Sequence, residues 1–399
     1  MMAMSSVVLL EPAPTDLLAI TLLPVALLLR QAELPRRIAP PAVLLWVFLI
    51  GNVLSISKAI DPLHAIAYAA ITGYLVLLWI LIVSYLAKQG ELGVRRLWSG
   101  YLVAATVAVV ATAVAYFVDV PWRELVVHRG YRGKGLFKDA NVFGPFLVPV
   151  ILYCMVQYSR LTHKKRLTYL GLAAVLSCGV ILSFSRGAWV NLFVSVSVLL
   201  FATAALIKKS RRGVIRVAIG ITLALIAIPF VVSVTGTGDF LSQRAALQAY
   251  DQVRFTAQRQ ALATVIREPL GIGPGQANEI LIQNPHNAYL HVAAENGWIG
   301  AVGFIGLIVL TFYRTTKGAM VSRGSLQDQY LIIGAALMGV LVNSIVIDSL
   351  HWRHLWLLLA VPWGLPLRQM GWSRAGNLAL ANYLTVDAPA GKPRLGTAR

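Results

Sequence analysis

The chain has 399 residues, of which 58% are hydrophobic and only 13% are charged, and its mean hydropathy is +0.71. This composition excludes an ordinary soluble domain, in which about a quarter of the residues are charged. The formal charge of +19 does not indicate a nucleic-acid partner, because the basic residues lie in short segments between apolar runs, and we therefore predict a multi-pass membrane protein.

A membrane-spanning helix needs about 20 mostly apolar residues. The first candidate, Thr15–Leu29, is short and contains Pro24. Ten further runs follow it, at 41–57, 63–87, 97–118, 141–157, 167–184, 187–207, 214–234, 298–313, 329–347 and 353–367. The sequence therefore predicts an all-α polytopic bundle of about eleven or twelve transmembrane helices within residues 1–374. The tail at 375–399, rich in Gly, Ala, Pro and Arg, is expected to be disordered.

The distribution of Lys and Arg predicts the orientation, since these residues are in excess on the cytoplasmic side of membrane proteins. When the segments between the runs are assigned to alternate sides, one side holds 23 of the 35 basic residues and only 4 of the 16 acidic residues. The segments on that side are 30–40, 88–96, 158–166, 208–216, 314–328 and the tail from 368. We expect them in the cytoplasm, in contact with anionic membrane lipids, and the N-terminus outside.

Two long connections lie on the opposite, outer side, at 119–140 and 235–285. Long loops often carry function. The first one is rich in basic residues and glycine, includes Arg132 and Lys138, and leads into Asn141. This pattern predicts a flexible, cationic loop that suits a phosphate group, and a plain solvated loop is the alternative.

Two outer arginines stand apart from the basic loop. Arg254 lies in the stretch 245–266, which contains no Gly or Pro and predicts a helix within the second long connection. Arg186 lies where two apolar runs meet, with no room for a loop. An arginine at a membrane boundary can extend to the lipid surface, but its position on the outer side favours an anionic partner.

A Gly-x-Gly-x-Gly run at 271–275 predicts a tight turn with exposed backbone N–H groups. A dinucleotide site is not indicated, because no strand precedes the run. The helix predicted after it places Asn287, His291 and Glu295 on one face and His286 on another. We interpret His291 with Glu295 as a structural pair, and His286 as either a helix cap or a functional group.

Five short motifs between about 130 and 310 follow one another in a fixed order. They are Gly135-Leu136-Phe137, Asp139-Ala140-Asn141, Ser185-Arg186-Gly187, Pro269-Leu270-Gly271-Ile272-Gly273 and Pro285-His286-Asn287-Ala288-Tyr289-Leu290. Each motif is weak alone. Together, on the outer face of a bundle of this size, they make the chain resemble the O-antigen ligase and Wzy-type polymerase superfamily.

The resemblance implies a C-type (GT-C-like), all-helical glycosyltransferase in the bacterial inner membrane, with its active site on the periplasmic face. The donor would be a glycan linked to undecaprenyl diphosphate, and no nucleotide sugar, metal or other cofactor would be needed. The acceptor would be a sugar of the lipid A core in a ligase of lipopolysaccharide biosynthesis. In an O-antigen, capsule or exopolysaccharide polymerase, the acceptor would be the growing glycan.

The resemblance and the side-chain chemistry together predict the site. Guanidinium forks match phosphate oxygens, so we expect Arg186 and Arg254 to hold the diphosphate. We expect His286 to be the catalytic base, since nearby arginines would lower its pKa and keep the imidazole neutral. The secondary candidates are Asn141, Asn287, Arg132 and Lys138. Attack opposite the leaving diphosphate would invert the anomeric centre.

A secondary transporter for an anionic solute is a rival interpretation, because it would also place arginines in a helical bundle. Such a transporter predicts two related halves with interrupted helices near the middle of the membrane. The sequence shows no such repeat, and its candidate residues lie at the outer boundary. The enzyme is therefore the favoured hypothesis.

Overall fold

The computed structural model describes residues 2–9, 12–28, 34–128, 131–161, 163–207, 212, 215 and 249–367. The first half of the bundle contains a 3-10 turn at Met2–Met4, α1 (Pro14–Leu28), a 3-10 turn at Arg36–Ile38, α2 (Ala39–Ile56), α3 (Pro62–Phe117) and α4 (Arg123–Val126). A two-stranded antiparallel ribbon of β1 (Val127–His128) and β2 (Arg132–Gly133) leads to α5 (Ala140–Arg160). Next come α6 (His163–Leu182), α7 (Arg186–Ala202) and a π turn at Thr203–Ile207. The last described helices are α10 (Ala249–Arg267), α11 (Ala277–Ile280), α12 (Ala288–Val321), α13 (Gly324–Asn343) and α14 (Arg353–Gly364).

The predicted fold class, an all-α polytopic membrane protein, is confirmed. Within the described ranges, seven helices are long and apolar enough to cross a membrane. One of them, α3, has 56 residues and changes direction at Gly90, whose φ is 54°. At about 1.5 Å per residue α3 is long enough for two crossings, which matches the two runs predicted there. The predicted span 214–234 and the tail 375–399 lie outside the described residues.

Three predicted connections are more ordered than expected. The segment 88–96 is helical and belongs to α3, where Arg95 Nη2 pairs with Glu91 Oε1 at 2.8 Å. Likewise, α12 continues through the start of the predicted loop at 314–328. The outer segment 119–140 contains α4 and the β1–β2 ribbon, so the prediction of a simply flexible loop is wrong for its described part.

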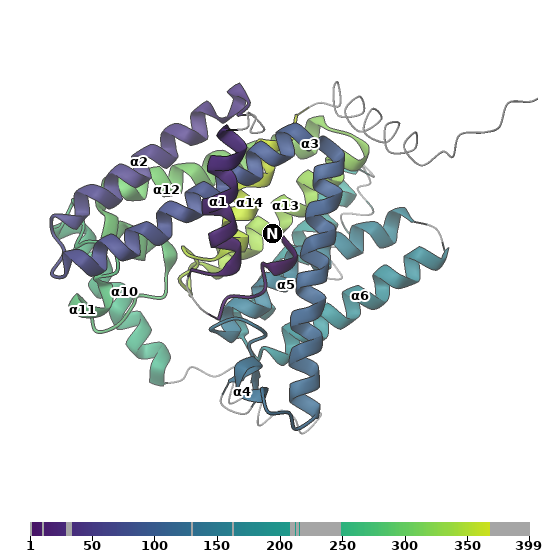
Figure 1. The fold of residues 1–399 in the computed structure, drawn as a ribbon, viewed down its shortest axis with the longest axis horizontal. Coiled ribbons are helices and arrows are strands. Elements are labelled where there is room, and N and C mark those ends of the chain that lie inside the picture. Colours follow the sequence, from purple (N-terminus) through teal and green to yellow (C-terminus); the bar gives the residue numbers. More distant parts are fainter. Residues whose placement is uncertain are drawn as a thin grey trace, which may run out of the picture.

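Glycines allow a close helix contact between α2 and α12, which run side by side in Figure 1. A Cβ atom on Gly51 would lie 2.3 Å from the backbone nitrogen of Gly300, and one on Gly303 would lie 2.4 Å from that of Phe48. Backbones approach this closely in membranes because only small residues lie between them. This contact fixes the helix that follows His286.

Contacts between distant segments agree with the predicted alternation of sides. The Val8 N–H donates to the Leu136 carbonyl at 2.8 Å, which joins the N-terminus to the first long outer connection. Arg160 Nη2 pairs with Asp328 Oδ1 at 2.7 Å, which joins two segments predicted to be cytoplasmic. In both cases the partners come from segments that the charge distribution assigns to one side.

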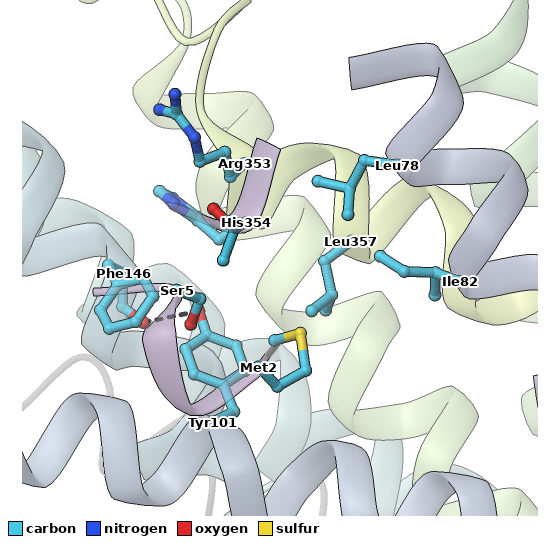
Figure 2. A pocket seen from close by; sticks show the side chains of 10 residues that line it. Met2, Ser5, Leu78, Ile82, Tyr101, Phe146, Arg353, His354 and Leu357 are labelled. Atoms are coloured by element: carbon cyan, nitrogen blue, oxygen red, sulfur yellow. Dashed lines mark hydrogen bonds between the residues drawn. The ribbon is translucent and has the colours of Figure 1, made fainter. Parts of the chain in front are cut away.

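A small cavity lies between the N-terminal segment, α1, α3, α5 and α14. Its walls are mainly apolar, and Figure 2 shows the Ser5 side chain near the rings of Phe146 and Tyr101, with His354 close by. Ser5 Oγ and His354 Nε2 are buried and have no hydrogen-bond partner in the described part of the chain. The cavity is lined by none of the predicted site residues.

Candidate active site

The first long outer connection contributes a hydrogen-bonded cluster around Asn141. Arg132 Nη2 donates to Asn141 Oδ1 at 2.9 Å, and Ser185 Oγ donates to the same oxygen at 2.8 Å. The Asp139 side chain caps α5 by accepting the Asn141 N–H at 3.0 Å. Asn141 therefore joins β2 to the start of α7 and places Arg132 beside the residue that precedes Arg186.

Arg186 is the first residue of α7 and is half-buried. Ser185 is the N-cap of this helix, and its Oγ accepts the Ala188 N–H at 3.3 Å. The short turn between α6 and α7 holds Phe184 at φ 45°, a conformation that is uncommon for a residue other than glycine. The turn is tight enough to keep Arg186 at the end of the bundle, as the adjoining apolar runs predicted.

His286 does not lie in a helix. It precedes α12 with φ 48°, and its N–H donates to Asn284 Oδ1 at 2.9 Å. The next residue, Asn287, is the N-cap of α12, because its Oδ1 accepts the N–H groups of Tyr289 and Leu290, both at 3.1 Å. The prediction that His286 occupies another face of this helix is therefore wrong. The helix begins only at Ala288, after its cap residue Asn287.

The charges around His286 come from four segments. Burial, and after it the charge of Arg254, lower the pKa of His286 from its ordinary value of 6.5. Asp348 and Asp139 act in the opposite direction and reduce the shift, while the charge of His291 adds to the lowering. The net direction favours a neutral imidazole near pH 7, as predicted. These interactions also bring Arg254 of α10 and Asp139 of the Asn141 cluster into the electrostatic neighbourhood of His286.

A buried row of charged groups supports the start of α12. His291 Nδ1 lies 2.7 Å from Asp348 Oδ2, and His291 Nε2 lies 2.9 Å from Glu295 Oε1. Burial would raise the pKa of Asp348, but the charge of His291 and the contact with it outweigh burial and lower it. Glu295 accepts the N–H groups of Gly275 and Ala277 at 2.8 and 3.0 Å. The interpretation of His291 with Glu295 as a structural pair agrees with this geometry.

The glycine run does form a turn, since Gly271, Gly273 and Gly275 have φ between 73° and 100°. The expectation of exposed N–H groups is wrong at Gly275, because Glu295 accepts that donor and the turn is buried. A Cβ atom on Gly271 would lie 2.3 Å from the Glu295 carbonyl oxygen. The turn therefore needs glycine for close packing against α12.

The predicted helix in the second outer connection is present as α10, which carries Arg254 and packs on α12. Gln258, one turn further on, places its Nε2 3.5 Å from the Ile345 carbonyl oxygen, at the segment that also contains Asp348. Figure 1 shows α10 and α11 together beside one end of α12. Residues 245–248 of the predicted helix lie outside the described residues.

The structure thus links Arg132, Asn141 and the Arg186 segment by hydrogen bonds, and Arg254 with His286 by charge. Two secondary candidates differ from these. The Asn287 side-chain oxygen is occupied by the helix cap, and Lys138 is exposed. The sequence analysis missed Asp348, which lies in a short connection directly after an apolar run. An ionisable residue at such a boundary is the signal that indicates it.

The fold and the site define a multi-pass, all-α membrane protein with a group of arginines and a neutral histidine at one end of its bundle. Residues 171–305 match the family model described as O-Antigen ligase (Wzy_C), which confirms the resemblance drawn from the motifs. The matched region contains Arg186, Arg254 and His286. It supports a ligase- or polymerase-like function in O-antigen assembly. No curated protein matches the chain in sequence.

Proposed function

We propose that this protein is an O-antigen ligase-like glycosyltransferase. It moves a glycan from undecaprenyl diphosphate to a hydroxyl group of the lipid A core, at the periplasmic face of the inner membrane. The observation that carries the proposal is that Arg254 and Asp139, which is hydrogen-bonded to Asn141, both act electrostatically on His286. Arg186, Arg254 and His286 lie within the matched family region.

The leaving group of this reaction is a lipid diphosphate, which carries negative charge as the glycosidic bond breaks. Arg186 and Arg254 bind its phosphate oxygens and neutralise that charge. Arg132, held by Asn141, adds a positive charge next to the start of α7. The guanidinium group suits this role better than an ammonium group, because its planar fork can donate two parallel hydrogen bonds.

His286 acts as the general base. Its lowered pKa keeps the imidazole neutral, so that one ring nitrogen can accept the proton of the acceptor hydroxyl. The hydroxyl oxygen forms a bond to C1 of the donor sugar while the bond from C1 to the diphosphate oxygen breaks. The products are the extended acceptor, with an inverted anomeric centre, and undecaprenyl diphosphate. None of these proposed steps requires a metal ion.

The test measures transfer by the purified protein in nanodiscs, with an undecaprenyl-diphosphate-linked glycan and isolated lipid A core as substrates. Arg186→Ala and Arg254→Ala should each lose transfer, since removal of one charged hydrogen-bonding partner weakens binding by about 2–5 kcal/mol. Lys should substitute poorly at either position. Unchanged transfer by well-folded Arg254→Ala would remove this residue from the site.

His286 requires a separate comparison. His286→Ala should lower the rate by about 10²–10⁴-fold, the usual contribution of a positioned base. His286→Gln keeps a hydrogen-bonding group but cannot take up the proton, so it should be as slow as His286→Ala. The exposed His64→Gln is the matched control. Near-normal turnover by His286→Gln would show that the residue only orients the acceptor.

The acceptor decides between ligase and polymerase, because both use the same donor chemistry. Product on the lipid A core supports the ligase. Product only on a second undecaprenyl-linked glycan would instead support an O-antigen, capsule or exopolysaccharide polymerase. No transfer from either donor–acceptor pair, by folded protein, would contradict the proposed function.

A further inference from the structure

The N-terminus of α7 lies in the candidate site, with Arg186 and Gly187 as the first two residues of the helix. The first N–H groups of a helix have no acceptor within the helix and carry partial positive charge. A helix start of this kind can bind an anion. A specific anion site also needs a side chain that donates a hydrogen bond to the ligand at this helix start. Gly187 faces a side chain that can do so.

Asn343, the last residue of α13, lies directly against Gly187. It is 1% exposed, and neither its Oδ1 nor its Nδ2 has a hydrogen-bond partner among the residues that the structure describes. A Cβ atom on Gly187 would lie 2.4 Å from Asn343 Oδ1 and 3.8 Å from Nδ2. Because residue 187 has no side chain, the Asn343 carboxamide can face the first turn of α7.

The surroundings of Asn343 connect this turn to His286. The neighbouring Ser344 carbonyl accepts the Ala288 N–H at 2.9 Å, and Tyr289 Oη donates to the Leu341 carbonyl at 2.8 Å. The end of α13 is therefore fixed against the segment that follows His286. Asn343 lies between the helix that begins at Arg186 and the segment that carries the proposed base.

A buried amide without partners is unfavourable, since it has lost its hydrogen bonds to water and gained none in exchange. Polar groups inside a membrane bundle therefore usually have a function. A phosphate oxygen at the start of α7 would accept a hydrogen bond from Asn343 Nδ2 when the carboxamide turns this nitrogen, in place of the nearer Oδ1, towards Gly187. It would also interact favourably with the helix terminus and with the charge of Arg186.

We propose that Asn343 and the first turn of α7 form a binding site for one phosphate of the donor's diphosphate, next to Arg186. The inference rests on the proposed function and adds a residue outside the matched family region. Asn343 is neutral, so it contributes the direction of a hydrogen bond rather than charge. The leaving diphosphate is then held by a side chain from α13 as well as by the arginines.

The experiment measures binding of undecaprenyl diphosphate, without a glycan, to wild-type and Asn343→Leu protein in nanodiscs, together with the thermal unfolding temperature. Leu has a similar volume and removes both unpartnered polar atoms, so the unfolding temperature should be equal to or above that of the wild type. Binding should be about 10- to 100-fold weaker, as expected for the loss of a hydrogen bond to a charged group.

Asn191→Leu is the matched control. Asn191 is fully buried on the same face of α7 as Gly187, one turn deeper. Its Nδ2 also has no partner within the described ranges, whereas its Oδ1 accepts a hydrogen bond from Ser195 Oγ at 3.2 Å. A Cβ atom on Gly339 of α13 would lie 2.4 Å from Asn191 Oδ1, so Asn191 also faces a glycine of the neighbouring helix. Because Asn191 lies one turn away from the start of α7, Asn191→Leu should bind the lipid as the wild type does. Gly187→Ala keeps Asn343 but displaces its carboxamide, so it should also weaken binding.

Three results would overturn the inference. Wild-type binding by Asn343→Leu would show that the amide does not contact the diphosphate, and the proposed function would stand. Equal losses of binding and stability in Asn343→Leu and Asn191→Leu would show that Asn343 only packs α7 against α13. Failure of the wild-type protein to bind undecaprenyl diphosphate would contradict the proposed function together with the inference.

Discussion

Replacement of Glu295 by Gln tests the buried charged row that supports the site. Both carboxylate oxygens of Glu295 are used, one by the Gly275 N–H at 2.8 Å and the other by the Ala277 N–H at 3.0 Å. The second oxygen also lies 2.9 Å from His291 Nε2. A Gln side chain has one oxygen, and its NH₂ group would face a backbone donor. Either Gly275 or Ala277 would then lose its acceptor.

The magnitude follows from the burial of these groups, since Glu295 is 1% exposed. A hydrogen bond to a charged group contributes about 1.5–3 kcal/mol, and a buried donor left without an acceptor costs about 1–3 kcal/mol. His291 would also keep Asp348 but lose the opposite charge on its other side. We expect Glu295→Gln to lower the free energy of unfolding by about 3–5 kcal/mol in total.

The assay is thermal unfolding of the purified protein in detergent, followed by transfer activity at a temperature at which both proteins are folded. We expect an unfolding temperature about 5 °C or more below that of the wild type, and reduced transfer because the start of α12, which follows His286 directly, loses support. Glu279→Gln, the same change at an exposed position on α11, is the control. An unfolding temperature within about 1 °C of the wild type would refute the reasoning.

Two further predictions concern pH and backbone packing. The rate of transfer should rise with pH along a limb whose midpoint lies below 6.5, since burial and Arg254 lower the pKa of His286, and residual activity of Arg254→Gln should show that limb at higher pH. The lowered pKa also predicts how His286 affects the free energy of unfolding. Above about pH 6.5 this free energy should not depend on His286, and it should decrease as the pH falls towards the pKa of the folded protein, because the unfolded chain binds the proton more readily in that range. Chemical unfolding measured across pH, with His286→Gln as the reference, checks this direction. Gly271→Ala should prevent folded expression, since its Cβ atom would lie 2.3 Å from the Glu295 carbonyl oxygen at φ 84°, whereas Gly171→Ala on α6 meets nothing within 4 Å and should raise the unfolding temperature slightly.

Length and apolar composition were enough to predict α2, α5, α6 and α7, because a membrane span is defined by those two properties. They did not define where a helix bends or continues. The basic segment at 88–96 looks like a connection in the sequence, but in the structure the two helical parts of α3 meet directly at Gly90, whose positive φ makes the chain change direction within one residue. Periodicity cannot reveal one dihedral angle.

The candidate site was only partly accessible to sequence analysis for a different reason. Arg186, Arg254 and His286 could be selected because their side-chain chemistry suits a diphosphate and a proton transfer. The contact of His291 with Asp348 joins residues far apart in the chain, and no local pattern encodes such a pair. The same holds for Asn141, whose position in the sequence predicts a helix start and says nothing of Ser185.

The contact of the Ala288 N–H with the Ser344 carbonyl has a consequence for the synthesis of the protein. The first residue of the candidate site along the chain is Arg132 in β2 and the last is Asp348, so the site is built from segments more than 200 residues apart. Until α13 has been made and inserted, the segment after His286 lacks the carbonyl that fixes it, and His291 lacks Asp348. The proposed transfer therefore requires a chain that extends through Asp348, and a chain that terminates before residue 344 should be inactive even though the hydrogen bonds of the Asn141 cluster can already form.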